Sequence, residues 1–158
     1  MVTDCLIRTA TLDDEDALRE MRAAAGWAAE FVARALEEMA SGARIVCVAE
    51  VDGRPVGSVQ VLWNSDDPEM ADGHRVAHLS DLVVHADYRG RGIARQLAEH
   101  VENLARARGY GVMTLDVKQS APETQRRYER WGYQYYRQSI STWGNWLNGM
   151  RKTLLAPH

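Results

Sequence analysis

The stretch Arg89-Gly90-Arg91-Gly92-Ile93-Ala94 is the most informative part of the sequence, because it stands between two segments of different periodicity. The preceding residues 79–84 form an apolar run typical of a buried strand, and apolar residues after the stretch recur at helical spacing. Glycines at a strand-to-helix turn leave backbone N–H groups uncovered, and a helix N-terminus carries about half a positive charge. The stretch therefore predicts a binding site for an anion such as pyrophosphate.

Two common phosphate-binding loops do not fit this stretch. A Walker A loop requires Gly-Lys-Ser/Thr, whereas Ile93 and Ala94 follow Gly92. The dinucleotide fingerprint requires a third small residue where helix packs on strand, and Arg95 occupies that position. The remaining pattern Arg-x-x-Gly-x-Ala, from Arg89 to Ala94, resembles the coenzyme A pyrophosphate loop of the GNAT acetyltransferase superfamily.

Length and composition limit the possible classes of protein. With 158 residues, the chain is expected to form a single domain over residues 1–158. The net charge of -3 argues against a general nucleic-acid binder. No apolar run approaches the roughly 18 residues of a membrane span, and the first residues lack an apolar segment of signal-peptide length. We therefore expect a cytoplasmic protein with no membrane or nucleic-acid partner.

The cysteines and the acidic cluster near the N-terminus fit structural roles. Cys5 and Cys47 stand in apolar, strand-like runs without metal-ligand spacing, which favours small buried side chains. Thr11 and the acidic residues 13–16 fit the start of a helix, where they would cap the positive end. We expect no metal site.

The hydrophobic pattern predicts the order strand, two helices, three strands, helix, strand, helix, two strands. The expected strands cover residues 6–9, 45–51, 56–63, 76–84, 112–117, 133–138 and 150–155. Residues 120–123 predict a capping box at the last helix. The order resembles that of GNAT proteins over essentially the whole chain. The resemblance implies a mixed α+β fold with a central, mostly antiparallel sheet of about seven strands, four helices and a splayed strand pair.

The same resemblance implies acetyl-CoA as the cosubstrate. The backbone of Leu82, Val83 and Val84 would meet the pantetheine arm in the splayed pair. The pyrophosphate would lie in the cradle formed by Arg89, Gly90, Arg91, Gly92, Ile93 and Ala94. One position departs from the family, because Ala121 stands where an asparagine often contacts the cofactor. That contact is expected to be absent or supplied by Ser120.

Acetyl transfer to an amine needs a neutral nucleophile, a polarised thioester carbonyl and a proton for the departing thiolate. A backbone N–H at Val83 or Val84 is expected to polarise the carbonyl, as the resemblance suggests. Tyr128, in Tyr128-Glu129-Arg130-Trp131-Gly132-Tyr133, stands where the family carries its general-acid tyrosine. The alternative is that Tyr128 simply faces the core, since it is spaced three residues from Trp131.

The general base has several candidates. His78-Leu79-Ser80 resembles the His-Leu-His of serotonin N-acetyltransferase, a GNAT member that uses those histidines as bases. Asp116 stands where ribosomal-protein acetyltransferases of the superfamily carry an acidic base. Strand alternation predicts His78 and Asp81 on opposite faces, so that only one of them reaches the amine. A water chain is the remaining possibility.

The expected activity is direct transfer of the acetyl group to a primary amine of a small molecule or peptide in a ternary complex. A noncatalytic acyl-CoA sensor and an O-acyltransferase are the alternatives. Aromatic residues in loops near the first two helices and the last strands are expected to line the acceptor site, to fill the core or to form a homodimer contact. They are Trp27, Phe31, Trp63, Tyr135, Trp143 and Trp146.

Overall fold

The computed structural model describes residues 3–154, and a seven-stranded sheet runs through them in the order β1-β2-β3-β4-β5-β7-β6. All neighbouring strands are antiparallel except β4 and β5, which are parallel. The expected mixed fold with a mostly antiparallel sheet is confirmed. The strands are β1 (Leu6–Thr9), β2 (Arg44–Val51), β3 (Arg54–Leu62), β4 (Val76–Val84), β5 (Val112–Lys118), β6 (Gln134–Ile140) and β7 (Trp146–Thr153).

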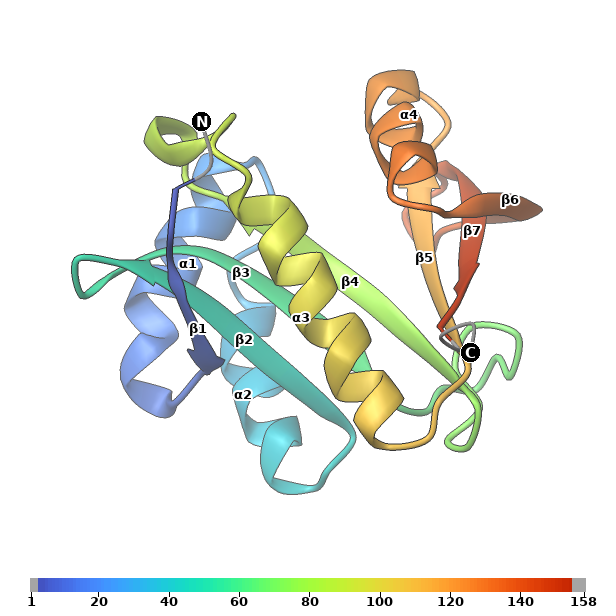
Figure 1. Ribbon diagram of the computed structural model, residues 1–158, viewed down its shortest axis with the longest axis horizontal. Coiled ribbons are helices and arrows are strands. Elements are labelled where there is room, and N and C mark those ends of the chain that lie inside the picture. Colours follow the sequence, from blue (N-terminus) through green and yellow to red (C-terminus); the bar gives the residue numbers. More distant parts are fainter. Residues whose placement is uncertain (1–2, 155–158) are drawn as a thin grey trace.

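Four α-helices cover the sheet within residues 3–154. They are α1 (Glu15–Ala24), α2 (Phe31–Ala40), α3 (Ile93–Ala107) and α4 (Pro122–Arg130), with short 3-10 turns at Leu12–Asp14 and Ala86–Tyr88. Figure 1 shows α1 and α2 behind the sheet and α3 in front of it. The two faces enclose separate apolar clusters, one beneath α3 and the other beneath α1 and α2.

A glycine in the sheet lets α3 pack closely. Ile93 and Leu97 are buried on the inner face of this helix. A Cβ atom at Gly57 of β3 would lie 3.1 Å from Leu97 Cδ1 and 3.3 Å from the Val83 carbonyl oxygen. Close packing of side chains leaves no room for that atom without displacement. The small residue at this contact therefore comes from the strand and not from the helix.

The parallel pair β4 and β5 is the splayed pair that the resemblance implies. Their register contains only Val76 with Val112, Ala77 with Met113, and His78 with Thr114. Beyond His78, both strands continue but diverge, and Figure 1 shows the opening between β4 and β5 with α4 and the start of α3 near its wide end. The opening leaves one edge of β4 unpaired among the described residues.

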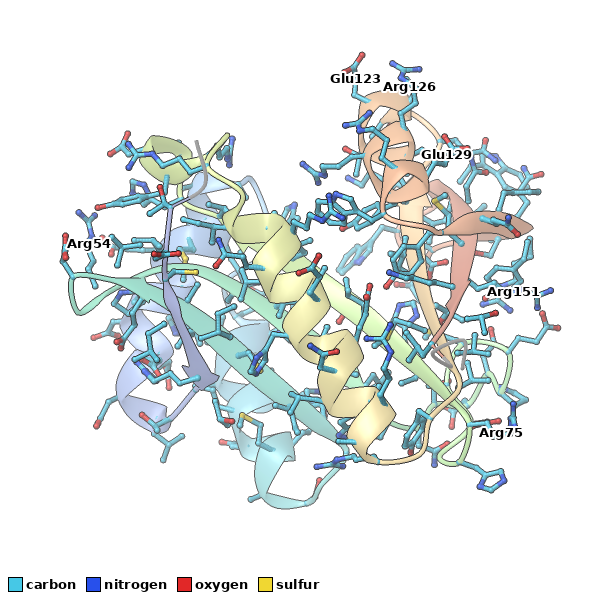
Figure 2. The ribbon with its side chains drawn as sticks, in the orientation of Figure 1. Arg54, Arg75, Glu123, Arg126, Glu129 and Arg151 are labelled. Carbon is cyan, nitrogen blue, oxygen red and sulfur yellow. The ribbon has the colours of Figure 1, made fainter. Side chains whose placement is uncertain are left out.

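The helix caps differ in part from the prediction. Thr11 and Asp14 form the expected capping arrangement before α1. The predicted capping box at residues 120–123 is wrong, because Ala121 is the N-cap of α4 and makes no side-chain cap, while Pro122 begins the helix. Figure 2 shows Glu123 and Arg126 pointing away from the molecule on this helix. Glu123 bonds Arg126 instead of an N-terminal amide.

The last strand begins earlier than the sequence indicates. We predicted a strand over residues 150–155, whereas β7 covers Trp146–Thr153 and pairs with β5 and β6. Trp146 pairs with Ile140 at the end of the hairpin, so this tryptophan belongs to the sheet and not to the connecting turn. Leu155 lies outside the described residues.

Candidate functional site

The turn between β4 and α3 presents backbone donors to solvent. Gly90 and Gly92 have φ values of 74° and 80°, in the left-handed region that glycine adopts without strain. No residue from 3 to 154 accepts a hydrogen bond from the N–H groups of residues 90–95. These amides lie at the N-terminus of α3, which has 15 residues. The turn is therefore arranged to bind an anion.

The arginines of the turn have neighbours of their own. Arg89 Nε donates to the Val84 carbonyl oxygen at 3.0 Å and so braces the turn against the end of β4. The Arg91 guanidinium lies 5.0 Å from the centroid of the Tyr88 ring. The Thr3 amide donates to the Arg91 carbonyl at 2.8 Å. These contacts hold the turn in place while the amides remain uncovered.

A cavity of about 680 Å³ opens beside the turn. Its walls come from the end of α1, the second half of β4, the glycine turn and α4. Nearly all the predicted cofactor residues line it: Leu82, Val83, Val84, Arg89, Gly90, Gly92, Ile93 and Ala94. Arg91 is outside the lining and contacts it through Tyr88. The sequence thus predicted one wall of the cavity almost completely.

A bulge in β4 changes the predicted faces of the strand. The register with β3 shifts between Ser58 and Gln60, and Asp81 has a φ of 53°. The extra residue turns the Asp81 carboxylate toward α1, where Arg22 Nη1 donates to it at 2.6 Å and Gln60 Nε2 donates at 3.0 Å. His78 lies on this same face, so the prediction of opposite faces is wrong. Strand alternation fails because it assumes no bulge.

The Arg22 side chain connects this bulge with the loop between α1 and α2. Besides its ion pair with Asp81, Arg22 donates from Nε to the Ala28 carbonyl oxygen at 2.7 Å. Its guanidinium also lies 5.4 Å from the Trp27 ring, which lines the cavity. Asp81 is therefore engaged in a structural ion pair that fixes one wall of the cavity.

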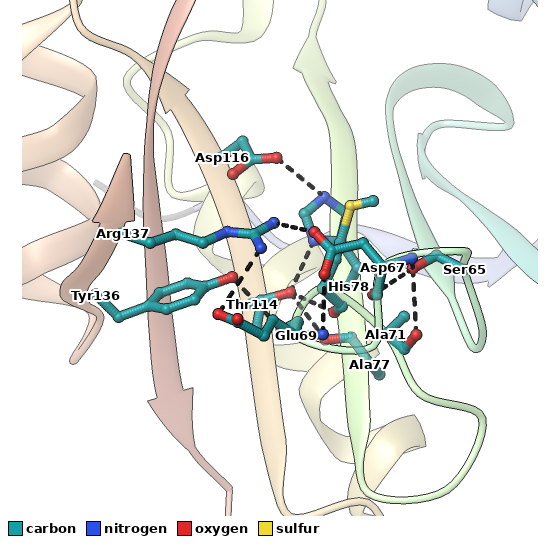
Figure 3. A network of polar contacts seen from close by, with 11 residues as sticks. Ser65, Asp67, Glu69, Ala71, Ala77, His78, Thr114, Asp116, Tyr136 and Arg137 are labelled. Atoms are coloured by element: carbon teal, nitrogen blue, oxygen red, sulfur yellow. Dashed lines mark hydrogen bonds and ion pairs between the residues drawn. The ribbon is translucent and has the colours of Figure 1, made fainter. Parts of the chain in front are cut away.

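His78, Thr114 and Asp116 meet where β4 and β5 begin to separate (Figure 3). His78 Nδ1 lies 2.8 Å from Thr114 Oγ1, and Nε2 lies 4.0 Å from Asp116 Oδ2. The His78 side chain is buried, and burial lowers its pKa to about 4, with Arg137 contributing in the same direction. Burial raises the pKa of Asp116. Two of the predicted base candidates are thus neighbours.

The loop between β3 and β4 lies beside His78 and Asp116. Arg137 of β6 forms an ion pair with Asp67 at 2.6 Å and reaches Glu69 at 3.8 Å. A Cβ atom at Gly149 of β7 would lie 3.0 Å from Arg137 Cγ and 3.1 Å from a carbon of the Tyr136 ring. The glycine therefore gives these side chains room to lie across the sheet beside Asp116, as Figure 3 shows.

Tyr128 lies on the inner face of α4. Its ring packs edge-on against Trp131 and Tyr133, with centroid distances of 5.3 and 5.9 Å. Tyr128 is 6% exposed and is not in the cavity lining, although Arg127 and Trp131 on either side of it are. Burial raises the pKa of the Tyr128 hydroxyl, while the nearby Arg127 guanidinium opposes that rise. Its role as general acid remains a prediction.

The aromatic candidates for the acceptor site do not gather in one place. Trp27 lines the cavity. Trp63 is buried between Tyr110, 5.0 Å away, and the Arg108 guanidinium, 4.2 Å away, so it is a core residue. The remaining four are exposed: Phe31, Tyr135, Trp143 and Trp146.

Sequence reasoning missed Thr114, Arg22 and Arg127 as residues of the site. Thr114 and Arg22 contact predicted residues only because the strand register and the bulge bring them together. Arg127 has a clearer sequence signal, because it directly precedes Tyr128 on a helix that faces the cavity. Its Nε atom is buried and has no hydrogen-bond partner among the described residues.

The chain matches the acetyltransferase (GNAT) family over residues 11–133. This match covers more than half of the 158 residues, and the chain belongs to that family. The match includes β4, the glycine turn, α3 and α4, which together form most of the cavity walls.

Solved structures of low sequence identity share the fold. A ribosomal-protein-alanine N-acetyltransferase from Brucella melitensis is 22% identical with a TM-score of 0.77, covering 94% of this chain and 99% of that one. YncA from Salmonella typhimurium, with its cofactor acetyl-CoA, is 19% identical with a TM-score of 0.76, covering 99% of both chains. An aminoglycoside 6'-N-acetyltransferase complexed with coenzyme A is also 19% identical with a TM-score of 0.76, covering 97% and 99%.

Neither a membrane-spanning helix nor a metal-ligand cluster occurs within residues 3–154. None of the helices in this part of the chain combines the length and apolar character needed to cross a membrane. The same residues contain no group of three or more His, Cys, Asp and Glu side chains that could hold a metal ion. Cys47 is buried, and burial raises the pKa of its thiol to about 12.

Proposed function

We propose that this protein transfers the acetyl group of acetyl-CoA directly to a primary amine of a small molecule or peptide within a ternary complex. One observation carries the proposal. The uncovered amides of residues 90–95 stand beside a cavity of about 680 Å³ that runs along the diverging half of β4. Membership of the acetyltransferase family and the cofactors in the two similar structures also support the proposal.

In this proposal the cofactor spans the cavity from the helix start to the opening of the sheet. The pyrophosphate accepts hydrogen bonds from the amides of residues 90–95, and the charge of the α3 N-terminus favours it. The pantetheine arm lies along Leu82, Val83 and Val84, where β4 has lost its pairing with β5. The arm would then occupy the place of a strand in the ladder, which satisfies backbone groups that would otherwise be unpaired.

The chemical steps require two protons to leave the amine nitrogen and one proton to reach the departing sulfur. An alkylammonium first gives a proton to the pair formed by His78 and Asp116, either directly or through water. The neutral amine nitrogen then attacks the thioester carbon, the carbon–sulfur bond breaks, and the electron pair departs on sulfur. Tyr128 gives its hydroxyl proton to that thiolate. The nitrogen loses its second proton as the amide forms, and that proton restores the Tyr128 hydroxyl, directly or through water. Asp81 is a weaker candidate for the base, because Arg22 and Gln60 already bond its carboxylate.

A substitution in the glycine turn tests cofactor binding. Gly92→Glu places a carboxylate where the proposal places the diphosphate, so coenzyme A affinity measured by calorimetry should fall at least tenfold, about 1.4 kcal/mol. Gly144→Glu is a matched control, since Gly144 has a φ of 82° in the turn between β6 and β7, where an added Cβ would meet no atom within 4 Å. Equal affinities for the two variants would refute the cradle.

A thiol-release screen tests the reaction. Acetyl-CoA is offered with polyamines, aminoglycosides, arylalkylamines, amino acids and peptide N-termini, and free coenzyme A is measured. The proposal predicts release that depends on the amine together with an N-acetylated product identified by mass spectrometry. Cofactor binding without release for any amine would favour the sensor, and an ester product would favour the O-acyltransferase.

A further inference from the structure

The neighbours of the Thr114 hydroxyl determine which of them accepts its single hydrogen bond. Its Oγ1 lies 2.6 Å from the Met70 carbonyl oxygen and 3.4 Å from the Ala77 carbonyl oxygen. Carbonyl oxygens only accept hydrogen bonds, so the hydroxyl donates to Met70. The hydroxyl is then left with lone pairs toward its third neighbour, His78 Nδ1, at 2.8 Å. Figure 3 shows Thr114 between His78 and Ala77 in this network.

The direction of this bond fixes the tautomer of His78. Because Thr114 accepts, Nδ1 must carry the ring proton, and in a neutral imidazole Nε2 is then a bare lone pair. That lone pair faces Asp116 Oδ2 at 4.0 Å, too far for a direct hydrogen bond. Two acceptors consequently face each other across a gap that a donor can bridge.

We infer that Thr114 is a positioning residue, which holds His78 as the Nδ1–H tautomer and so leaves Nε2 and Asp116 as a pair of acceptors for an N–H donor of the amine. This inference rests on the proposed function only for the identity of the donor. The tautomer itself follows from contacts within the chain. Met70 also belongs to the loop between β3 and β4, so the bond ties that loop to the site.

The charged surroundings favour a cationic donor in this gap. Asp116 lies on β5, with its Oδ2 atom 4.0 Å from Nε2 of the neutral His78 ring, and its side chain is 22% exposed. The guanidinium of Arg137 on β6 acts to lower the pKa of both groups, but Asp67 and Glu69 on the loop hold it. The carboxylate of Asp116 therefore lacks a cation in direct contact within residues 3–154. An ammonium group supplies both the charge and the N–H donors.

Nitrogen NMR of the histidine rings tests the tautomer directly. The protein is labelled with 15N-histidine, and His78→Gln identifies the resonances of His78. We expect a protonated Nδ1 and an unprotonated Nε2 in the wild type near neutral pH. Thr114→Val removes the acceptor, so the ratio of the two tautomers should move about tenfold toward Nε2–H, the equivalent of about one hydrogen bond. Thr114→Ser keeps the hydroxyl and should preserve the wild-type ratio.

The result for the wild type does not depend on how well a variant folds. An Nε2–H tautomer in the wild type, or an unchanged ratio in a folded Thr114→Val, would overturn the inference. Steady-state kinetics of the Thr114 variants distinguishes a failure of this inference from a failure of the proposed function. We expect Thr114→Val to lower kcat more than it changes the KM for acetyl-CoA, with recovery in Thr114→Ser. If Thr114→Val shows the expected tautomer shift but an unaltered kcat, His78 takes no part in the reaction. The assignment of the Nδ1–H tautomer would still hold.

Discussion

The burial of His78 predicts a specific loss of stability in acid. The folded protein holds the imidazole neutral down to a pKa of about 4, whereas the unfolded chain binds its proton below about 6.5. Between these two values the unfolded state binds more protons, so the free energy of unfolding decreases as the pH falls. Above about 6.5 both states are neutral, and the full contribution of this residue to stability is present.

The size of the effect follows from the separation of the two pKa values. Each pKa unit corresponds to about 1.4 kcal/mol, so the interval from 6.5 to about 4 corresponds to about 3 kcal/mol. The buried position of the side chain, which is 8% exposed, means that solvent screens little of this cost. About 3 kcal/mol is a large part of the 5–15 kcal/mol that typically stabilises a domain.

Urea unfolding of the wild type and His78→Gln at about pH 7.5 and 4.5 measures this contribution. Carboxylates that titrate in acid, such as Asp14 and Asp67, are present in both proteins and cancel in the difference. The stability advantage of the wild type should shrink by about 2–3 kcal/mol at the lower pH. His74→Gln, at an exposed loop position, controls for the loss of one histidine. Parallel pH profiles for the wild type and His78→Gln would show that the fold does not hold the His78 ring neutral in acid.

Three further substitutions have separate readouts. Tyr128→Phe should lower kcat for thiol release about 100-fold or more while calorimetry finds the same coenzyme A affinity, and equal turnover would remove this hydroxyl from the mechanism. Asp116→Asn should raise the KM for the amine at least tenfold, about 1.4 kcal/mol, with little change in the KM for acetyl-CoA; the reverse pattern contradicts its assignment to the acceptor. Glu102→Ala should lower the free energy of unfolding by about 3 kcal/mol, because the buried Glu102 carboxylate accepts from Tyr133 and pairs with Lys152; a loss below about 1 kcal/mol in urea unfolding would show the triad to be dispensable.

The sequence was sufficient for the features that depend on local periodicity. Residues 76–84 form the strand predicted for them, and the spacing of Ile93, Leu97 and Val101 correctly indicated the buried face of α3. The glycine turn was recognisable because a backbone with positive φ favours glycine, so the residue type itself indicates the conformation. Gly90 and Gly92 both have positive φ values.

The features that the sequence did not reveal depend on tertiary contacts. The bulge at Asp81 exists where β3 and β4 change register, and no residue pattern distinguishes it from regular alternation. The sequence left open whether Trp63 lines the acceptor site or fills the core, and it packs in the core against Tyr110, which follows α3. Thr114 meets His78 only because β4 and β5 pair in parallel for three residues. Each of these needs knowledge of which strands are neighbours.

The proposed function depends above all on binding of the coenzyme A diphosphate by the backbone amides of residues 90–95. Amide NMR during titration with coenzyme A tests it most directly, because each N–H group reports on its own hydrogen bond. We predict that these amide protons move downfield as they gain charged acceptors, and that they move less with a pantetheine that lacks the diphosphate. Saturable binding that leaves the resonances of residues 90–95 unchanged would mean that these amides do not bind the diphosphate.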